Sequence, residues 1–150
     1  MTRLKAIFAV FVTATGKKAS VFASPFNQTF NTDTDSFQWQ ITIGSRRFPE
    51  RPCAGIAESF MRLRQAAGTF YGSSDHSILP SQYASNSYIL GCQLEKVDGQ
   101  ASHSGISTKD GSIVQLSVQN SGLSAGDTCL IFQVYDGLLS IRDGSCDVFE

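Results

Sequence analysis

One segment of the sequence alternates apolar and polar residues without a break. Within residues 36–43 (SFQWQITI), Phe37, Trp39, Ile41 and Ile43 occupy every second position. Because successive side chains of a β-strand point to opposite faces, this period of two predicts a strand with one buried face and one wet face. Trp39 shares its parity with the other apolar residues, so we predict a core role for it in preference to a sugar-stacking platform.

Short apolar stretches elsewhere predict further strands. They lie at residues 6–12, 87–95, 112–119, 129–135, 138–142 and 146–149. Asp136-Gly137 is expected to turn the chain back, and Asp143-Gly144 is a strong hairpin dipeptide. A short return strand at 46–49 is expected to end before Pro52, because proline cannot donate a hydrogen bond to a β-ladder.

One segment has a helical period instead. Ile56, Phe60, Leu63 and Ala67 recur at helical spacing, and Gly68 stands where a helix commonly ends. This predicts a single short helix at about residues 55–67. The following residues 69–86, rich in serine, tyrosine and glycine, are expected to form a long loop or two short irregular pieces.

About eight strands, one inserted helix and closely spaced turns predict an all-β fold. The strand number fits best an antiparallel eight-stranded jelly-roll sandwich. A chain of 150 residues is long enough to bury one core, and the sequence has no internal repeat or linker. Residues 1–150 are therefore expected to form a single jelly-roll domain.

Charge excludes several classes of partner. Twelve Lys and Arg balance thirteen Asp and Glu, so no positive field favours specific nucleic-acid binding, and no apolar stretch approaches the ~20 residues of a membrane span. One basic concentration contains Arg46, Arg47, Arg51, Arg62 and Arg64. It could contact an acidic partner or nucleic acid, but we interpret it as a solvated face balanced by Glu50 and Glu58.

The motifs of common enzymes are missing from the sequence. His76 follows Asp75 and His103 lies between two serines, but no G-x-S-x-G elbow accompanies them. Asp33 and Asp35 lack the glycine and terminal glutamate of a calcium loop, and no glycine motif forms a phosphate cradle. We therefore predict no catalytic, cofactor-binding or metal-binding residue, and a protein that is not an enzyme.

The cysteines and the N-terminus permit two interpretations. Cys53, Cys92, Cys129 and Cys146 could form two disulfides in a secreted chain, but buried reduced thiols are favoured because free cysteine packs as a small hydrophobic residue. No pair has the spacing of a metal site. Residues 1–16 imitate a cleavable signal peptide, yet a buried strand is favoured there. The glycosylation sequon at residues 27–29 would matter only after secretion.

Several segments of the chain, taken in sequence order, resemble one protein family. They are 37–50 (FQWQITIGSRRFPE), 57–68 (AESFMRLRQAAG), 88–97 (YILGCQLEKV) and 135–150 (YDGLLSIRDGSCDVFE), with 3–8 (RLKAIF) and 105–111 (GISTKDG) also similar. Together they resemble the C-terminal jelly roll of double jelly-roll major capsid proteins, as found in Polinton-like and adintovirus-like DNA viruses and their integrated relatives. The similarity spans nearly the whole chain in order.

The resemblance implies a structural virion protein with no catalytic residues. Members of that family carry two jelly rolls per chain, form trimers and tile an icosahedral shell. This chain would then be the C-terminal half of a longer capsid protein, with copies of itself and a second jelly-roll domain as partners. The alternative is a secreted jelly-roll binding module, lectin-like or cytokine-like, with residues 1–16 removed and two disulfides formed.

Overall fold

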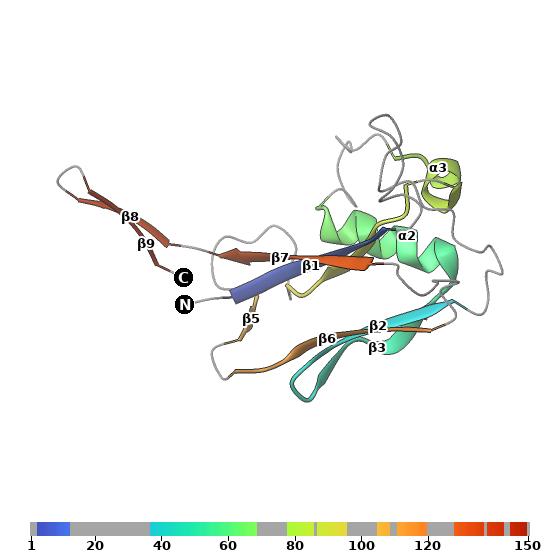
Figure 1. The fold of residues 1–150 in the computed structure, drawn as a ribbon, viewed down its shortest axis with the longest axis horizontal. Helices are drawn as coiled ribbons and strands as arrows, with labels where there is room; N and C mark the ends of the chain where they lie inside the picture. The colour runs from blue at the N-terminus through green and yellow to red at the C-terminus, as the bar shows by residue number, and fades with distance from the viewer. Residues whose placement is uncertain are drawn as a thin grey trace.

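The computed structural model describes residues 3–12, 37–68, 78–85, 87–95, 105–108, 111–119, 128–136, 138–142 and 145–149. Within these ranges the chain is mostly β-strand, in two antiparallel sheets that face each other, with a helix against one sheet and a hairpin that projects from the body (Figure 1). The predicted all-β sandwich is therefore confirmed. No described helix is long and apolar enough to cross a membrane.

The first sheet is organised around β1 (Arg3–Val12). Its other strands are β4 (Leu90–Gln93), β5 (Ile106–Ser107) and β7 (Thr128–Asp136). β7 pairs with β1 along the whole strand, so β4 and β5 share the opposite edge of β1. The favoured interpretation of the N-terminal segment as a buried strand is thus confirmed, and β1 is the central strand of this sheet.

The second sheet has β2 (Gln38–Ile43) between β3 (Arg46–Ala54) and β6 (Val114–Gln119). The expectation that pairing stops before Pro52 is wrong, because β3 pairs with β2 again at Trp39 and Cys53. The register shifts opposite Gln40, whose side-chain amide Nε2 donates to the carbonyl oxygens of Pro49 (2.9 Å) and Glu50 (3.1 Å). This side chain bridges the stretch where the prolines interrupt the ladder.

The core lies between the two sheets. Trp39, Ile41 and Ile43 of β2 point into it, as their alternation predicts, and so does Phe37 just before the strand. The first sheet contributes a second alternating set: Leu4, Ile7, Ala9, Phe11, Tyr88, Leu90, Cys92 and Leu94. Burial is the main force here, since each large apolar side chain removed from water contributes about 1.5–3 kcal/mol.

Helix α2 (Gly55–Ala66) confirms the predicted helix. Leu63 is buried and Ile56 and Phe60 are partly buried, whereas Ala67 is exposed because the helix ends one residue before it. Gly68 adopts a φ of 70°, as its predicted place after the helix requires. The helix packs so closely across β4 that a Cβ added at Gly91 would lie 2.9 Å from the Cα of Leu63.

A second helix corrects the expectation of a single one. α3 (Pro80–Ser85) occupies part of the segment predicted as a loop or short irregular pieces. Tyr83 on α3 is fully buried, stacks near Tyr88 with ring centroids 4.9 Å apart, and donates to the carbonyl oxygen of Ile89 at 3.0 Å. Tertiary packing of one tyrosine therefore holds a helix that the local sequence pattern does not reveal.

The eight strands expected for the jelly roll are not all found among the described residues. The two sheets contain seven strands among the described residues, while β8 (Leu138–Arg142) and β9 (Ser145–Phe149) form a separate hairpin. The Asp143-Gly144 hairpin prediction is confirmed, but the chain does not turn back at Asp136-Gly137. One intervening residue is shorter than the two-residue loops that commonly join paired strands, so β8 leaves the sheet.

Candidate functional site

Most residues first considered for chemistry lie outside the described ranges. This holds for His76, His103, Asp33 and Asp35. Within the described ranges, no three His, Cys, Asp or Glu side chains gather in a way that could hold a metal ion.

One polar cluster lies at the junction of β2, β3 and α2. Trp39 Nε1 donates to Ser59 Oγ at 2.9 Å, and Ser59 Oγ donates to the carbonyl oxygen of Gly55 at 2.8 Å. Cys53 Sγ lies 3.6 Å from the same hydroxyl, and burial raises the pKa of this thiol to about 11. A protonated thiol is a poor nucleophile. The cluster therefore joins the three elements instead of forming a reactive centre.

The prediction of buried reduced thiols holds for Cys53 and Cys92 but not for Cys129. Cys53 and Cys92 are buried and carry free thiols, as predicted, whereas the free thiol of Cys129 is exposed on β7. The side chain of Cys146 lies outside the described part of the structure. Burial raises the pKa of Cys92 to about 12, for the same reason as for Cys53. Both core thiols thus stay protonated in neutral solution.

These raised pKa values predict that the protein loses stability in alkali. The unfolded thiols ionise near pH 9, whereas folded Cys53 and Cys92 hold their protons to about pH 11 and 12. The contribution of these thiols to the free energy of unfolding should therefore be fully present well below pH 9 and fall as the pH rises through 9, by up to about 2 kcal/mol per thiol at pH 10.5. Urea unfolding at pH 7.5, 9 and 10.5 measures this fall. Cys92→Ala, although less stable at pH 7.5, should lose less between pH 9 and 10.5; an unchanged loss would contradict the assignment.

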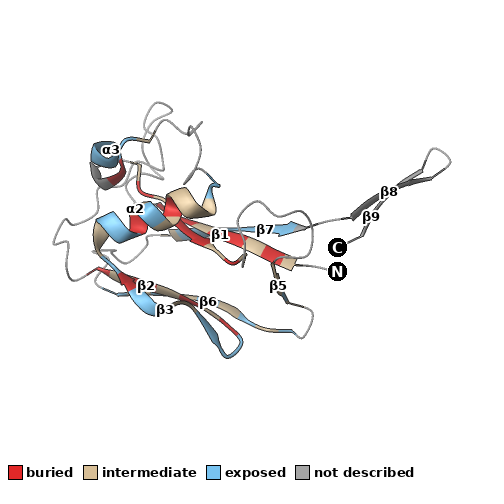
Figure 2. Cartoon of the chain, turned by 180° about the vertical axis from the view of Figure 1, so that it is seen from behind, coloured by how far each residue is buried: buried red, intermediate tan, exposed pale blue. Residues whose placement is uncertain are grey.

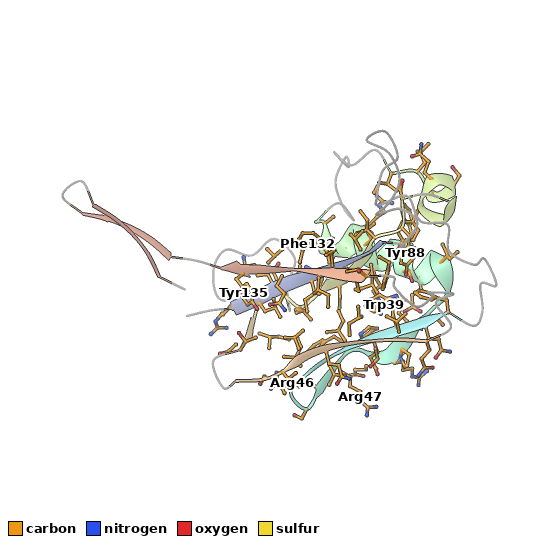
Figure 3. All side chains as sticks on the ribbon, viewed as in Figure 1. Trp39, Arg46, Arg47, Tyr88, Phe132 and Tyr135 are labelled. Atoms are coloured by element: carbon orange, nitrogen blue, oxygen red, sulfur yellow. The ribbon has the colours of Figure 1, made fainter. Side chains whose placement is uncertain are left out.

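The five arginines do not form one surface. Arg46 and Arg47 lie at the β2–β3 turn, at the far margin of the second sheet (Figure 3), whereas Arg62 and Arg64 belong to α2, which packs on the first sheet. Arg62 pairs with Glu58 one helical turn away at 3.5 Å. A partly exposed pair of this kind contributes little to stability. Arg46, Arg47 and Arg51 are exposed, as the interpretation as solvated side chains predicts, whereas Arg62 and Arg64 are only partly exposed.

The most unusual surface of the described chain is β7. Figure 2 shows this strand as exposed beside the buried β1. Phe132 is 52% exposed, Ile131 44% and Val134 43%, with Leu130 and Tyr135 only slightly more covered. A contiguous patch of exposed apolar side chains is uncommon on a monomeric protein. Where such a patch occurs, it commonly marks an interaction surface. We refer to residues 130–135 as the β7 surface.

The two faces of β7 are both apolar. Leu130, Phe132 and Val134 pair with the residues of β1 that face away from the core, while Ile131 pairs with core-facing Ala9. Phe132 and Tyr135, two residues of this exposed run, are labelled in Figure 3. The core-facing side of β7 is exposed because none of the described strands of the second sheet reaches over it. β7 therefore extends beyond the sandwich core.

A groove continues the β7 surface toward α2. It has a volume of about 390 Å³ and is lined by Phe8, Val134 and the C-terminal end of α2 with the two residues after it, 66–68. Lys5 and Glu95 form an ion pair of 3.2 Å in its wall. The lining is largely apolar, with charge confined to one neutralised pair, which suits an apolar side chain of a partner better than a charged ligand.

Comparison with known proteins leaves the family open. No protein-family model matches the sequence, and no similar curated protein or solved structure was found. The resemblance to capsid jelly rolls thus rests on the residue patterns of this chain.

Sequence reasoning located β7 but missed its exposure. Residues 129–135 read CLIFQVY, a run in which both parities are apolar. Such a run is typical of a strand covered on both faces, and in this structure neither face is fully covered. The apolar pattern was therefore visible in the sequence, but only the packing shows that both faces are partly exposed.

Proposed function

We propose that this chain is a self-associating structural subunit of a virion, the C-terminal jelly roll of a capsid protein. The observation that carries this proposal is the β7 surface, an apolar strand at the edge of a sheet with both faces half exposed. A monomeric protein would be more stable if these side chains were covered. A subunit that packs against its neighbours uses them as contacts.

The strand pairing supports the jelly-roll part of the proposal. β1 pairs with β7, and inside that pair β2 pairs with β6, so early strands meet late strands in nested order. A jelly roll has this nesting because a long antiparallel ribbon is rolled around one core. The two-sheet arrangement and the ordered capsid-like segments of the sequence point in the same direction.

The composition of the surface suits close packing of identical copies. The net charge is −1, so neighbouring subunits would not repel one another strongly. The exposed residues of β7 from Cys129 to Tyr135 carry no charge at neutral pH. We propose trimers as the assembly unit and a second jelly-roll domain as a further partner, as the capsid resemblance implies.

The position of β1 argues against the secreted alternative. Cleavage after residue 16 would remove β1, which pairs with three other strands and contributes Leu4, Ile7 and Phe11 to the core. Cys53, Cys92 and Cys129 also carry free thiols. A secreted module with two disulfides would have to fold without β1 and with its thiols oxidised in pairs.

Assembly can be tested by removing apolar contacts from the β7 surface. We expect the chain to form trimers or larger particles in sedimentation velocity and electron microscopy, alone or joined to a second jelly roll. Phe132→Ser with Val134→Ser should weaken association about 10- to 100-fold, because two half-exposed side chains would no longer be buried between copies.

Ile113→Ser provides the matched control for these substitutions. Ile113 is 79% exposed and immediately precedes β6, in the other sheet, so its replacement should leave assembly unchanged. Circular dichroism shows whether each variant remains folded. A chain that stays monomeric at all concentrations, even with a second jelly roll attached, would refute the proposed function.

A further inference from the structure

We propose that the β8–β9 hairpin of one copy adds to the open edge of β7 in a second copy, with β8 antiparallel to β7. This inference rests on the proposed function and specifies how two subunits join. It concerns backbone pairing at the strand edge, whereas the assembly proposal concerns the apolar faces. Two features of the same chain, an open edge and a projecting hairpin, lead to it.

The first feature is the edge of β7. One edge pairs with β1 from Arg3 to Val12, and no other described strand pairs with β7. Along its second edge, the backbone N–H and C=O groups of residues 129–135 therefore have no strand partner in the described part of the chain. Natural proteins usually protect such an edge with charge, proline, a bulge or a covering segment, because it is a template for another strand. Residues 129–135 contain neither charge nor proline.

The second feature is the hairpin itself. β8 and β9 pair with each other over five residue pairs, from Leu138↔Phe149 to Arg142↔Ser145, and with neither of the two sheets. Figure 1 shows the hairpin extending away from the sandwich. An isolated two-stranded hairpin is only marginally stable in water, so it is expected to gain a third strand or a surface.

The hairpin cannot pair with β7 of its own chain. A single residue separates Asp136 at the end of β7 from Leu138 at the start of β8, so β8 continues outward and cannot fold back antiparallel. β9 pairs with β8 along its whole length and is therefore held on the projecting ribbon. A second copy of this chain offers the same open edge without this restriction.

The chemistry of the two strands permits this pairing. β8 reads LLSIR and β7 reads TCLIFQVYD, so their charges are confined to Arg142 and Asp136 at the strand ends. Like charges therefore never face each other in any antiparallel register of the two strands. The added strand would also extend the sheet beside the half-exposed side chains of the β7 surface.

Disulfide trapping between two distinguishable copies tests the pairing. In a Cys129→Ser, Cys146→Ser background, which keeps the buried Cys53 and Cys92, one copy carries one added cysteine at each position from 130 to 135 in turn, and a tagged copy carries one at each position from 138 to 142. The two copies are coexpressed, oxidised mildly and analysed by intact mass. Directly opposed residues of antiparallel strands have Cα atoms about 4.5–5.5 Å apart, within disulfide range.

Antiparallel pairing has a specific signature in this scan. Cross-links between copies should concentrate on pairs whose residue numbers add to one constant sum, at least tenfold above other pairs. Single cysteines at Gln115, Ser117 or Gln119, exposed positions on β6, serve as matched controls with the same tagged partners. Yields no higher than these controls, or yields without a constant sum, would overturn the inference.

Deletion of residues 138–149 separates this inference from the proposed function. If the inference holds, the shortened chain should lose at least tenfold in association relative to the full chain in sedimentation velocity. If the shortened chain assembles as well as the full chain, hairpin exchange is refuted while the proposed function stands. If the full chain does not associate at all, the proposed function itself is refuted, and the inference with it.

Discussion

Removing residues 1–16 is expected to abolish cooperative folding. The deletion takes away β1, the strand that joins β4, β5 and β7 in one sheet. It also removes the buried side chains of Leu4, Ile7 and Phe11, each worth about 1.5–3 kcal/mol. This loss is comparable to the whole stability of a typical domain, about 5–15 kcal/mol. Far-ultraviolet circular dichroism and urea unfolding should show no cooperative transition.

A shorter deletion is the control for this experiment. Removal of residues 1–2 leaves β1 complete, so that variant should unfold at the same urea concentration as the full chain. If the chain lacking residues 1–16 keeps a cooperative transition and the strand spectrum, β1 is dispensable. The secreted alternative would then regain its main argument.

Replacement of Trp39 by alanine is expected to lower the free energy of unfolding by about 3–5 kcal/mol. The indole is only 1% exposed and fills the centre of the core between the two sheets. Its Nε1 also donates to Ser59, which links β2 to α2. The substitution therefore opens a large cavity and removes a buried hydrogen bond together. Urea unfolding measures the effect.

Two further variants separate these contributions. Trp39→Phe keeps most of the ring volume but loses the indole donor, so we expect a smaller loss of about 1–3 kcal/mol. Ile113→Ala, at an exposed apolar site, should stay within about 0.5 kcal/mol of the parent protein. If Trp39→Ala were as mild as Ile113→Ala, the core placement of Trp39 would be wrong.

Local sequence patterns predicted the core more reliably than the architecture. The alternation of Phe37, Trp39, Ile41 and Ile43 identified a buried face correctly, because a strand period of two depends only on neighbouring residues. The same holds for the buried face of residues 88–94 and for the helix at Gly55–Ala66. Where the pattern was strong and local, the structure follows it.

The errors arose where distant residues decide the outcome. α3 was missed because Tyr83 is held by Tyr88 and Ile89, not by a helical period in its own segment. Pairing through Pro52 was missed because the side chain of Gln40, on another strand, bridges the interruption. Neither contact can be deduced from propensity, which records only local preferences.

The candidate site, like the fold, was predicted from the sequence only in part. By itself the sequence determined that residues 129–135 form an apolar strand, that Trp39 is a core residue and that the common catalytic motifs are missing. Only the tertiary structure decided that β7 lies at a sheet edge with both faces half exposed, and that β8 leaves the sheet. The physical reason is that hydrophobicity is a property of a residue, whereas exposure depends on which other segments reach it.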